Sequence, residues 1–244
     1  MAEIVTFDAP DQLMKAAADL VLGVARESVR DRGRFVWGLA GGQTPAMLYR
    51  LLAEEFYAAR MPWEETYVFW GDERWVTSDD PQSNQRMAFR ELLDGVPIPK
   101  ENIKRIITIG VEPRVSAEAI ERQLRTLYPG EPRPDLMLLG LGEDGHTASL
   151  FPGTTALLED AALFAANHVP DLDAWRITAT FPLINAARNV VFLVSGAEKA
   201  VAAYRVLYPQ PDSVVLPASM VQPSNGKLTW LLDRDAASRL PHAG

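Results

Sequence analysis

Short apolar runs alternate along the chain with longer segments in which apolar residues recur every three or four positions. Leu13, Ala17 and Val21 follow this helical spacing and fall on one face of the first such segment. The helical spacing predicts helices at about residues 11–31, 46–59, 84–93, 116–128 and 197–207. The apolar runs predict strands at residues 3–7, 35–40, 66–70, 103–108, 136–139, 162–168, 175–181, 189–195 and 228–232.

Strands and helices alternate in this pattern with short connections, and no repeat, low-complexity tract or linker interrupts them. Such alternation is typical of a mostly parallel sheet with helices packed on both faces. Residues 35–40 are apolar at nearly every position, as expected of a strand that is buried on both faces. The sequence therefore predicts a single α/β domain covering residues 1–244.

One predicted strand ends in the pattern G-x-G-x-x-G at residues 140–145, which contains Asp144 and is followed by His146. This spacing matches a dinucleotide-binding loop, but a long helix would have to follow it. Pro152 and Gly153 stop any following helix after about two turns, so the dinucleotide interpretation is rejected. A plain tight turn would explain the glycines but not the acid and the histidine. At the end of a buried strand, these two residues favour a catalytic turn.

A second glycine-rich loop, Gly41-Gly42-Gln43-Thr44-Pro45, lies between a predicted strand and a predicted helix. Adjacent glycines let the backbone approach a ligand closely, and the free amides of a helix start favour an anion. Thr44 adds a hydroxyl donor. The alternative is a helix that Thr44 caps, with Pro45 in its first position. No Lys-Ser/Thr pair follows, so a nucleoside triphosphate loop is not expected.

A third group of polar residues, at positions 71–74, ends the strand predicted at residues 66–70. Asp72 can orient a neighbour or accept a proton, and Arg74 can hold an oxyanion with two hydrogen bonds. The alternative is a solvated loop in which Arg74 pairs with Glu73.

Two further basic residues, Arg176 and Lys199, also lie beside predicted strand ends. Each of them alone is more typical of a surface position. Together with Arg74 and the loop that contains Gly42, they favour a phosphate pocket in an otherwise acidic protein.

Composition narrows the possible partners. A net charge of −8 and a pI near 5.0 argue against a nucleic-acid or anionic-membrane surface. The chain has no cysteine, and it lacks a His-Glu-x-x-His zinc helix, so no metal site is expected. No apolar stretch approaches the roughly 20 residues of a membrane span, and no signal-peptide pattern begins the chain. We expect a cytoplasmic protein in which His168 and His242 lie outside the site.

The motifs together resemble the 6-phosphogluconolactonases of the glucosamine-6-phosphate deaminase/isomerase superfamily, over nearly the whole chain. The resemblance rests on the segments at residues 41–45, 71–74, 83–84, 142–153, 176–178 and 196–199. It implies a Rossmann-like fold and the hydrolysis of 6-phospho-D-glucono-1,5-lactone to 6-phospho-D-gluconate, without a cofactor. It implies that Gly41, Gly42, Gln43, Thr44, Asn84, Arg176 and Lys199 bind the substrate and its phosphate. The family usually carries Ser where this chain has Gln43.

In the implied mechanism His146 acts as general base on the attacking water, because an imidazole with a pKa near 6.5 suits neutral pH. Arg74 and the amides of the glycine turn would stabilise the oxyanion. Asp144 would orient His146 or contact sugar hydroxyls, and the separate roles of Asp144 and Asp72 stay open. So does the oligomeric state.

Three alternatives to the lactonase remain: a sugar-phosphate deaminase or isomerase, a non-catalytic sugar-phosphate sensor and a nicotinamide-dependent oxidoreductase. Deaminases of the superfamily typically follow the histidine with an Ile-Ala-Phe-Asn-Glu type of sequence. In this chain no acid follows His146 until Glu159, which favours the lactonase.

Overall fold

The computed structural model describes residues 2–209 and 214–241, so His242 lies outside the described residues. The strands are β1 (Glu3–Phe7), β2 (Phe35–Leu39), β3 (Thr66–Trp70), β4 (Asp72–Arg74), β5 (Ile103–Lys104), β6 (Leu136–Leu139), β7 (Phe164–Val169), β8 (Ala174–Ala179), β9 (Asn189–Val194) and β10 (Lys227–Asp233). The α-helices are α1 (Pro10–Arg32), α2 (Gln43–Ala53), α3 (Glu55–Ala58), α4 (Asn84–Glu91), α5 (Pro113–Arg125), α6 (Phe181–Ala186) and α7 (Ala200–Leu207).

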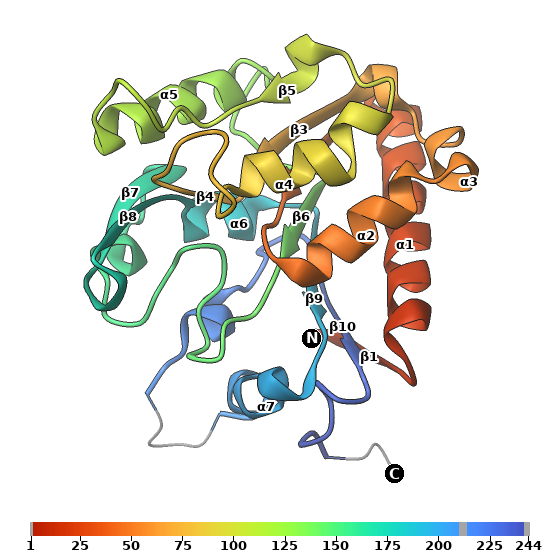
Figure 1. The fold of residues 1–244 in the computed structure, drawn as a ribbon, viewed down its shortest axis with the longest axis vertical. Helices are drawn as coiled ribbons and strands as arrows, with labels where there is room; N and C mark the ends of the chain where they lie inside the picture. Colours follow the sequence, from red (N-terminus) through yellow and green to blue (C-terminus); the bar gives the residue numbers. More distant parts are fainter. Residues whose placement is uncertain (1, 210–213, 242–244) are drawn as a thin grey trace.

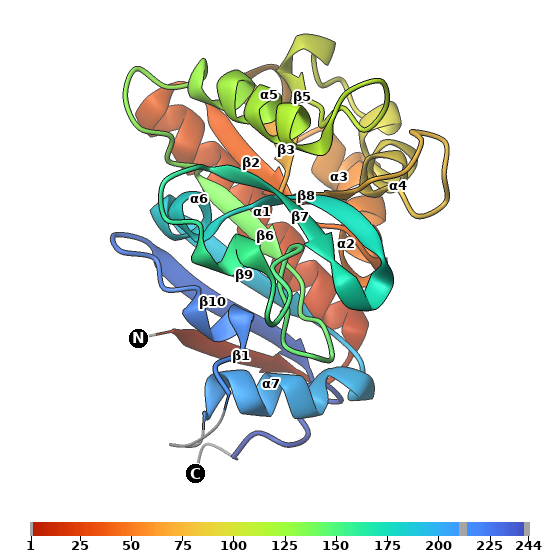
Figure 2. The same ribbon diagram turned by 90° about the vertical axis from the view of Figure 1, so that its left-hand side faces the viewer.

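Seven strands form a parallel sheet in the order β1-β10-β9-β6-β2-β3-β5. Helices α1 and α2 cover one face of this sheet, whereas α5, α6 and α7 lie on the other (Figures 1 and 2). Every residue of β2 and β6 is buried, as the continuous apolar runs require. The predicted α/β fold, with a mostly parallel sheet and helices on both faces, is confirmed.

The direction of strand addition reverses between β2 and β6, which are neighbours in the sheet. From β2 the chain adds β3 and β5 on one side, and from β6 it adds β9 and β10 on the other. At such a point the loops that leave the carboxyl ends of the two central strands diverge and open a crevice. The fold therefore places a crevice next to the loops at residues 41–45 and 140–146.

The local sequence of helix α1 accounts for both of its ends and for its buried face. Pro10 occupies the first helical turn, where a missing N–H costs nothing. Gly33 ends the helix with φ at 72°, and its amide donates to the Val29 carbonyl at 2.8 Å. Between them the face that includes Leu13 and Val21 is buried against the large sheet. The helix predicted from periodicity at residues 11–31 is confirmed.

A second, smaller sheet was not predicted. It contains β4, β8 and β7, and both of its strand pairs are antiparallel. Only four residues, 170–173, separate β7 from β8, and a connection this short can join antiparallel but not parallel neighbours. The strands predicted at residues 162–168 and 175–181 therefore exist as β7 and β8, but they pair in this small sheet and not in the parallel one. Residues 72–74 form the strand β4, so the alternative of a solvated loop at this position is wrong.

Three other elements differ from the predictions. The strand expected at residues 103–108 is limited to β5, and beyond it the Thr108 hydroxyl donates to the Val76 carbonyl at 2.6 Å. The helix expected at residues 46–59 is divided into α2 and α3 by the extended backbone of Glu54. Helix α6 was not predicted. In the described part of the chain, no helix has the length and apolar character that crossing a membrane needs.

Candidate active site

The carboxyl ends of β9, β6, β2 and β3, which are neighbours in the sheet, surround a cavity of about 220 Å³. Each of these strands leads into one of the polar loops singled out in the sequence. The cavity lining includes the predicted site residues Gly41, Gly42, Asp72, Arg74, His146 and Lys199. The parallel sheet thus brings these six together from segments far apart in the chain.

His146 and Asp144 form a hydrogen-bonded pair in the turn after β6. His146 Nδ1 lies 2.6 Å from Asp144 Oδ1, which also accepts the His146 backbone N–H at 3.1 Å. A carboxylate accepts hydrogen bonds, so it favours the tautomer with the proton on Nδ1 and leaves Nε2 able to take a proton. Phe151 stacks on the imidazole with ring centroids 4.0 Å apart. The ring is therefore held in one orientation beside the cavity.

The environment of Asp144 keeps its carboxyl ionised. Partial burial acts to raise the pKa of Asp144, but hydrogen bonds from the side chain and backbone of His146 outweigh it. The pKa consequently lies below its ordinary value. An ionised carboxylate on Nδ1 suits the predicted role of orienting the imidazole.

Gly142 and Gly145 have a geometric reason to be glycine. A Cβ on Gly142 would clash with His146 Nδ1 and would lie 2.7 Å from Asp144 Oδ1. Gly145 has φ at 82°, a conformation that other residues rarely adopt. Gly140 meets neither condition, because a Cβ there would have no described atom within 4 Å. The nucleotide-like pattern is therefore a turn shaped around the His–Asp pair.

The amides of this turn are used within it. Gly142 N–H donates to the His146 carbonyl at 2.8 Å, and Gly145 N–H donates to the Gly142 carbonyl at 3.0 Å. These two hydrogen bonds contradict the prediction of an oxyanion donor for the amides of Gly142 and Gly145, since both already have acceptors. Stabilisation of an oxyanion would fall to Arg74.

Replacing Gly142 with Ala is expected to lower kcat/KM for the expected lactone substrate about tenfold, because the new Cβ must displace the His146 imidazole. The matched control is Gly130→Ala, on the loop after α5 and outside the hollows around the site, where the added methyl meets open space and kcat/KM should stay within twofold. Both variants are compared by steady-state kinetics and thermal unfolding. Equal activity in the two variants would contradict the assigned role of Gly142.

The Tyr49 hydroxyl holds the loop after β2 in place, and this loop leads into the first turn of α2. The buried Tyr49 hydroxyl bonds both the N–H and the carbonyl of Ala40, each at 2.9 Å. Gly42, with φ at 96°, then caps α2, whose first internal bond runs from Ala46 N–H to the Gly42 carbonyl. Helix α2 thus begins at Gln43 and not at the predicted residue 46, and the alternative in which Thr44 caps the helix is wrong.

Lys199 faces this helix start across a second hollow of about 240 Å³, which adjoins the first at Gly42. Gln43 and Thr44 line it, and their amides have no acceptor within the helix. Among the described residues none forms an ion pair with Lys199, while Glu198 lies on the same rim. A free ammonium opposite free amides suits a phosphate group.

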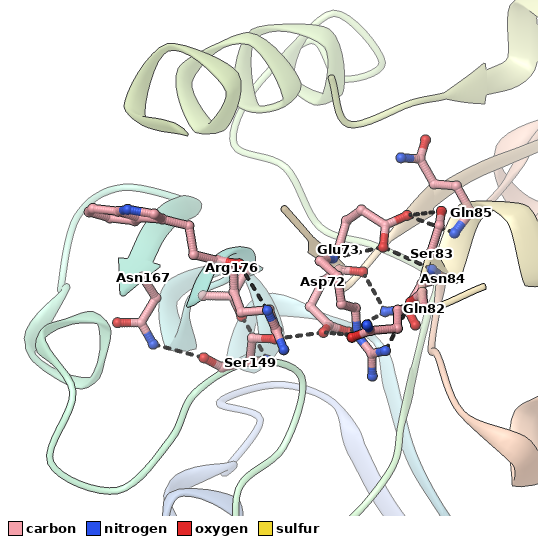
Figure 3. Close-up of polar contacts among 12 residues, drawn as sticks. Asp72, Glu73, Gln82, Ser83, Asn84, Gln85, Ser149, Asn167 and Arg176 are labelled. Atoms are coloured by element: carbon pink, nitrogen blue, oxygen red, sulfur yellow. Dashed lines mark hydrogen bonds and ion pairs between the residues drawn. The ribbon is translucent and has the colours of Figure 1, made fainter. Parts of the chain in front are cut away.

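Glu73 has a role that the sequence did not reveal. Its buried carboxylate accepts the backbone N–H groups of Arg74, Asn84 and Gln85 at 2.7–2.8 Å and the Ser83 hydroxyl at 3.0 Å (Figure 3). Burial raises the pKa of Glu73, and these hydrogen bonds oppose the rise. The predicted alternative, an ion pair of Glu73 with Arg74, was wrong. Glu73 instead ties β4 to the start of α4.

Asn84 is held by this anchor and in turn fixes Asp72. Its side-chain amide donates to the Asp72 carbonyl at 3.0 Å and to Asp72 Oδ1 at 3.3 Å (Figure 3). The same side chain packs so close to Gly41 that a Cβ there would clash with it. Asn84 therefore positions both Asp72 and the glycine loop, and the predicted direct contact of Asn84 with substrate stays a prediction.

Arg74 and Arg176 lie opposite each other on β4 and β8. Arg74 Nη1 donates to the Gln82 carbonyl at 2.9 Å, and its buried Nε has no hydrogen-bond partner among the described atoms. Burial, and then the charge of Arg74, lower the pKa of Arg176. Arg176 does not line the hollow that contains Lys199. It does not line the cavity of about 220 Å³ either, so the structure brings Arg74 and Lys199 together there but not Arg176, whose predicted contact with the phosphate stays a prediction.

Two arginines of α4 were not predicted as site residues. Arg86 and Arg90 line a third hollow, of about 130 Å³, together with Arg74, Gln43 and Gly42. Their spacing of four residues places them on the same side of the helix. This i, i+4 spacing was the feature of the sequence that could have indicated them as site residues. The two arginines add positive charge beside Arg74.

Two further expectations concern histidine and metals. His168 lies on the small sheet, with Nε2 3.4 Å from Asp173 Oδ1 and its ring against Trp175. It does not line the cavity, in agreement with the predicted structural role. Within residues 2–209 and 214–241, no three His, Asp or Glu side chains converge as a metal site would require.

Comparison with known proteins places the chain among its relatives. The model of the glucosamine-6-phosphate isomerase/6-phosphogluconolactonase family matches residues 8–230. The chain belongs to this family. A 6-phosphogluconolactonase from Nostoc sp. is 43% identical over 238 residues, covering 95% of this chain and 96% of that protein. A 6-phosphogluconolactonase from Synechocystis sp. is 44% identical over 218 residues, covering 88% of each.

Two solved structures have the same fold as this chain. A 6-phosphogluconolactonase from Trypanosoma cruzi matches with a TM-score of 0.87 and 30% identity, over 98% of this chain and 97% of that chain. A monomeric glucosamine-6-phosphate deaminase matches with a TM-score of 0.82 at 22% identity, over 97% and 99%. At that identity the likeness shows the fold alone. The family description names glucosamine-6-phosphate isomerases as well as 6-phosphogluconolactonases, so the residues of the site must distinguish between these activities.

Proposed function

We propose that this protein is a 6-phosphogluconolactonase, which hydrolyses 6-phospho-D-glucono-1,5-lactone to 6-phospho-D-gluconate in the oxidative pentose phosphate pathway. The observation that carries the proposal is the Asp144–His146 pair, with 2.6 Å between Oδ1 and Nδ1, in a cavity that Lys199 also lines. The names of relatives that are 43% and 44% identical support it.

In this proposal His146 activates the attacking water. A lactone is an activated ester, so one positioned water and one base suffice, without a covalent nucleophile or a cofactor. Nε2 of His146 takes a proton from water as the water oxygen bonds to the lactone carbonyl carbon. The ring C–O bond then breaks, and the imidazolium returns the proton to the ring oxygen. Water is the sole co-substrate: its hydroxyl group bonds to the carbonyl carbon, and its proton goes to the ring oxygen.

Asp144 and Arg74 support opposite charges during this reaction. The Asp144 carboxylate keeps the proton on Nδ1 and stabilises the imidazolium that forms at His146. Arg74, which lines the cavity and whose Nε lies 4.0 Å from the Asp72 carboxylate, stabilises the oxyanion on the former carbonyl oxygen. Asp72 is buried and already accepts two side-chain hydrogen bonds. Its role in this proposal is therefore to position Arg74 and not to transfer a proton.

The substrate's phosphate binds at the hollow between α2 and Lys199. The amides of Gln43 and Thr44 and the Thr44 hydroxyl donate to the phosphate oxygens, and Lys199 supplies the charge. Backbone donors make this site tolerant of Gln43 in place of the family's usual Ser. The phosphate thereby holds the lactone with its carbonyl toward His146.

The experiment is a coupled assay of phosphogluconolactone hydrolysis. We expect purified protein to remove the lactone faster than its spontaneous hydrolysis, and to release no ammonia from glucosamine 6-phosphate. The chain has no acid between His146 and Glu159, which is the basis for expecting no deaminase activity. Ammonia release without lactone hydrolysis would replace this proposal by the deaminase alternative.

A further inference from the structure

Ser149 follows His146 by three residues and is 2% exposed. Each of its polar groups bonds a different strand of the small sheet (Figure 3). The hydroxyl donates to Asp72 Oδ2 on β4 at 2.7 Å, and the backbone N–H donates to Thr178 Oγ1 on β8 at 3.1 Å. The carbonyl accepts from Asn167 Nδ2 on β7 at 2.9 Å. This one residue therefore fixes the turn that contains His146 to all three strands.

The chain between His146 and Ser149 has little freedom to absorb a shift. The Thr147 hydroxyl donates to the Gly140 carbonyl at 2.9 Å, and Leu150 N–H donates to the Thr147 carbonyl at 2.9 Å. Ala148 has φ at 48°, in the left-handed region that is unfavourable for alanine. A displacement of Ser149 would therefore move His146 as well.

The acceptor of the Ser149 hydroxyl is the carboxylate that also orients Arg74. Asp72 Oδ2 accepts from Ser149 and lies 4.0 Å from Arg74 Nε, while Oδ1 accepts from Asn84. The base lies on the loop after β6, and the proposed oxyanion donor lies on β4. The Ser149–Asp72 bond is a direct side-chain link between that loop and β4.

We propose that Ser149 is a positioning residue for lactone hydrolysis, which sets the placement of His146 relative to Arg74 through its hydrogen bond to Asp72. The inference rests on the lactonase function proposed above. Ser149 lines none of the hollows around the site, so it acts through Asp72 and the turn without touching substrate.

The test is Ser149→Ala, measured with 6-phosphogluconolactone against the wild type. We expect kcat to fall about tenfold, because small misplacements of a base and an oxyanion donor are costly. KM should change less than twofold, because Lys199 and the start of α2 belong to loops after β9 and β2. Loss of a merely structural contact would lower the unfolding temperature and leave kcat of the folded protein unchanged.

Ser116→Ala is the matched control. Ser116 is equally buried on α5, where its hydroxyl donates to the Ile107 carbonyl away from the cavity. It should lower stability and leave kcat unchanged. Ser149→Cys keeps the shape with a weaker donor and should give an intermediate kcat, which also supplies the test if Ser149→Ala folds poorly.

A second readout does not depend on turnover. The imidazole NMR signals of His146, assigned by their loss in His146→Ala, should shift in Ser149→Ala and stay in place in Ser116→Ala. If wild-type protein hydrolyses no lactone, the proposed function fails. If the wild type is active and Ser149→Ala retains its kcat and its His146 signals, the inference about Ser149 is overturned and the lactonase function stands.

Discussion

Replacing His146 with alanine is expected to lower kcat for 6-phosphogluconolactone by about 10²–10⁴-fold, the usual contribution of a positioned general base. The water would lose its proton acceptor, and the ring oxygen would lose its proton donor. The start of α2 and Lys199 are untouched, so KM should change less than threefold. Steady-state rates, corrected for spontaneous hydrolysis of the lactone, measure both constants.

His168→Ala is the matched control for this substitution. His168 also carries a carboxylate neighbour, at 3.4 Å, but lies on the small sheet and does not line the cavity. Its kcat should stay within twofold of the wild type. Near-wild-type turnover in His146→Ala would remove His146 from the role of general base, and Arg74 and Asp72 would have to be reconsidered.

The sequence predicted six of the residues that line the cavity because of one property of parallel sheets. Their carboxyl ends share an edge, so polar loops that follow apolar runs meet there. Asp72, His146, Lys199 and the loop with Gly42 all follow this rule. No distance between these loops had to be known, since the strand order alone makes them neighbours.

The small sheet was missed because its pattern is weak and its pairing is not local. Residues 72–74 are polar, and they form β4 by pairing with β8. Because β8 lies about a hundred residues further along the chain, the local sequence does not indicate this pairing. The short connection at residues 170–173 was the readable sign of an antiparallel hairpin. This sheet matters for function, because it holds Asp72 and Arg74 beside the His146 turn.

Glu73 and Ser149 show a second limit of reading the chain locally. An acid next to an arginine suggests an exposed ion pair, but the partners of Glu73 are chiefly the amides and hydroxyl of residues 83–85. Ser149 looks like an ordinary small residue until its three bonds to different strands are seen. Such roles depend on tertiary contacts, and sequence periodicity does not encode them.

Replacing Lys199 with alanine is expected to raise KM for the lactone about 10- to 100-fold, with a smaller effect on kcat. Hydrogen bonds to a charged group contribute about 1.5–3 kcal/mol, and about 1.4 kcal/mol corresponds to a factor of ten. Lys199 faces the amides of Gln43 and Thr44, where the proposed phosphate lies. Its charge should therefore act mainly on binding, in the ground state and the transition state alike.

Lys227→Ala is the control for the loss of one positive charge. Lys227 is exposed at the first residue of β10, at the amino end of a parallel strand and so at the edge opposite the cavity. The KM of Lys227→Ala should equal that of the wild type. Lys199→Arg restores the charge, so its KM should lie closer to that of the wild type than the KM of Lys199→Ala does. Titration with 6-phosphogluconate gives the same comparison without turnover. A large loss of kcat at unchanged KM would move Lys199 from the phosphate to the reacting carbonyl, because Lys199 also lines the cavity beside His146.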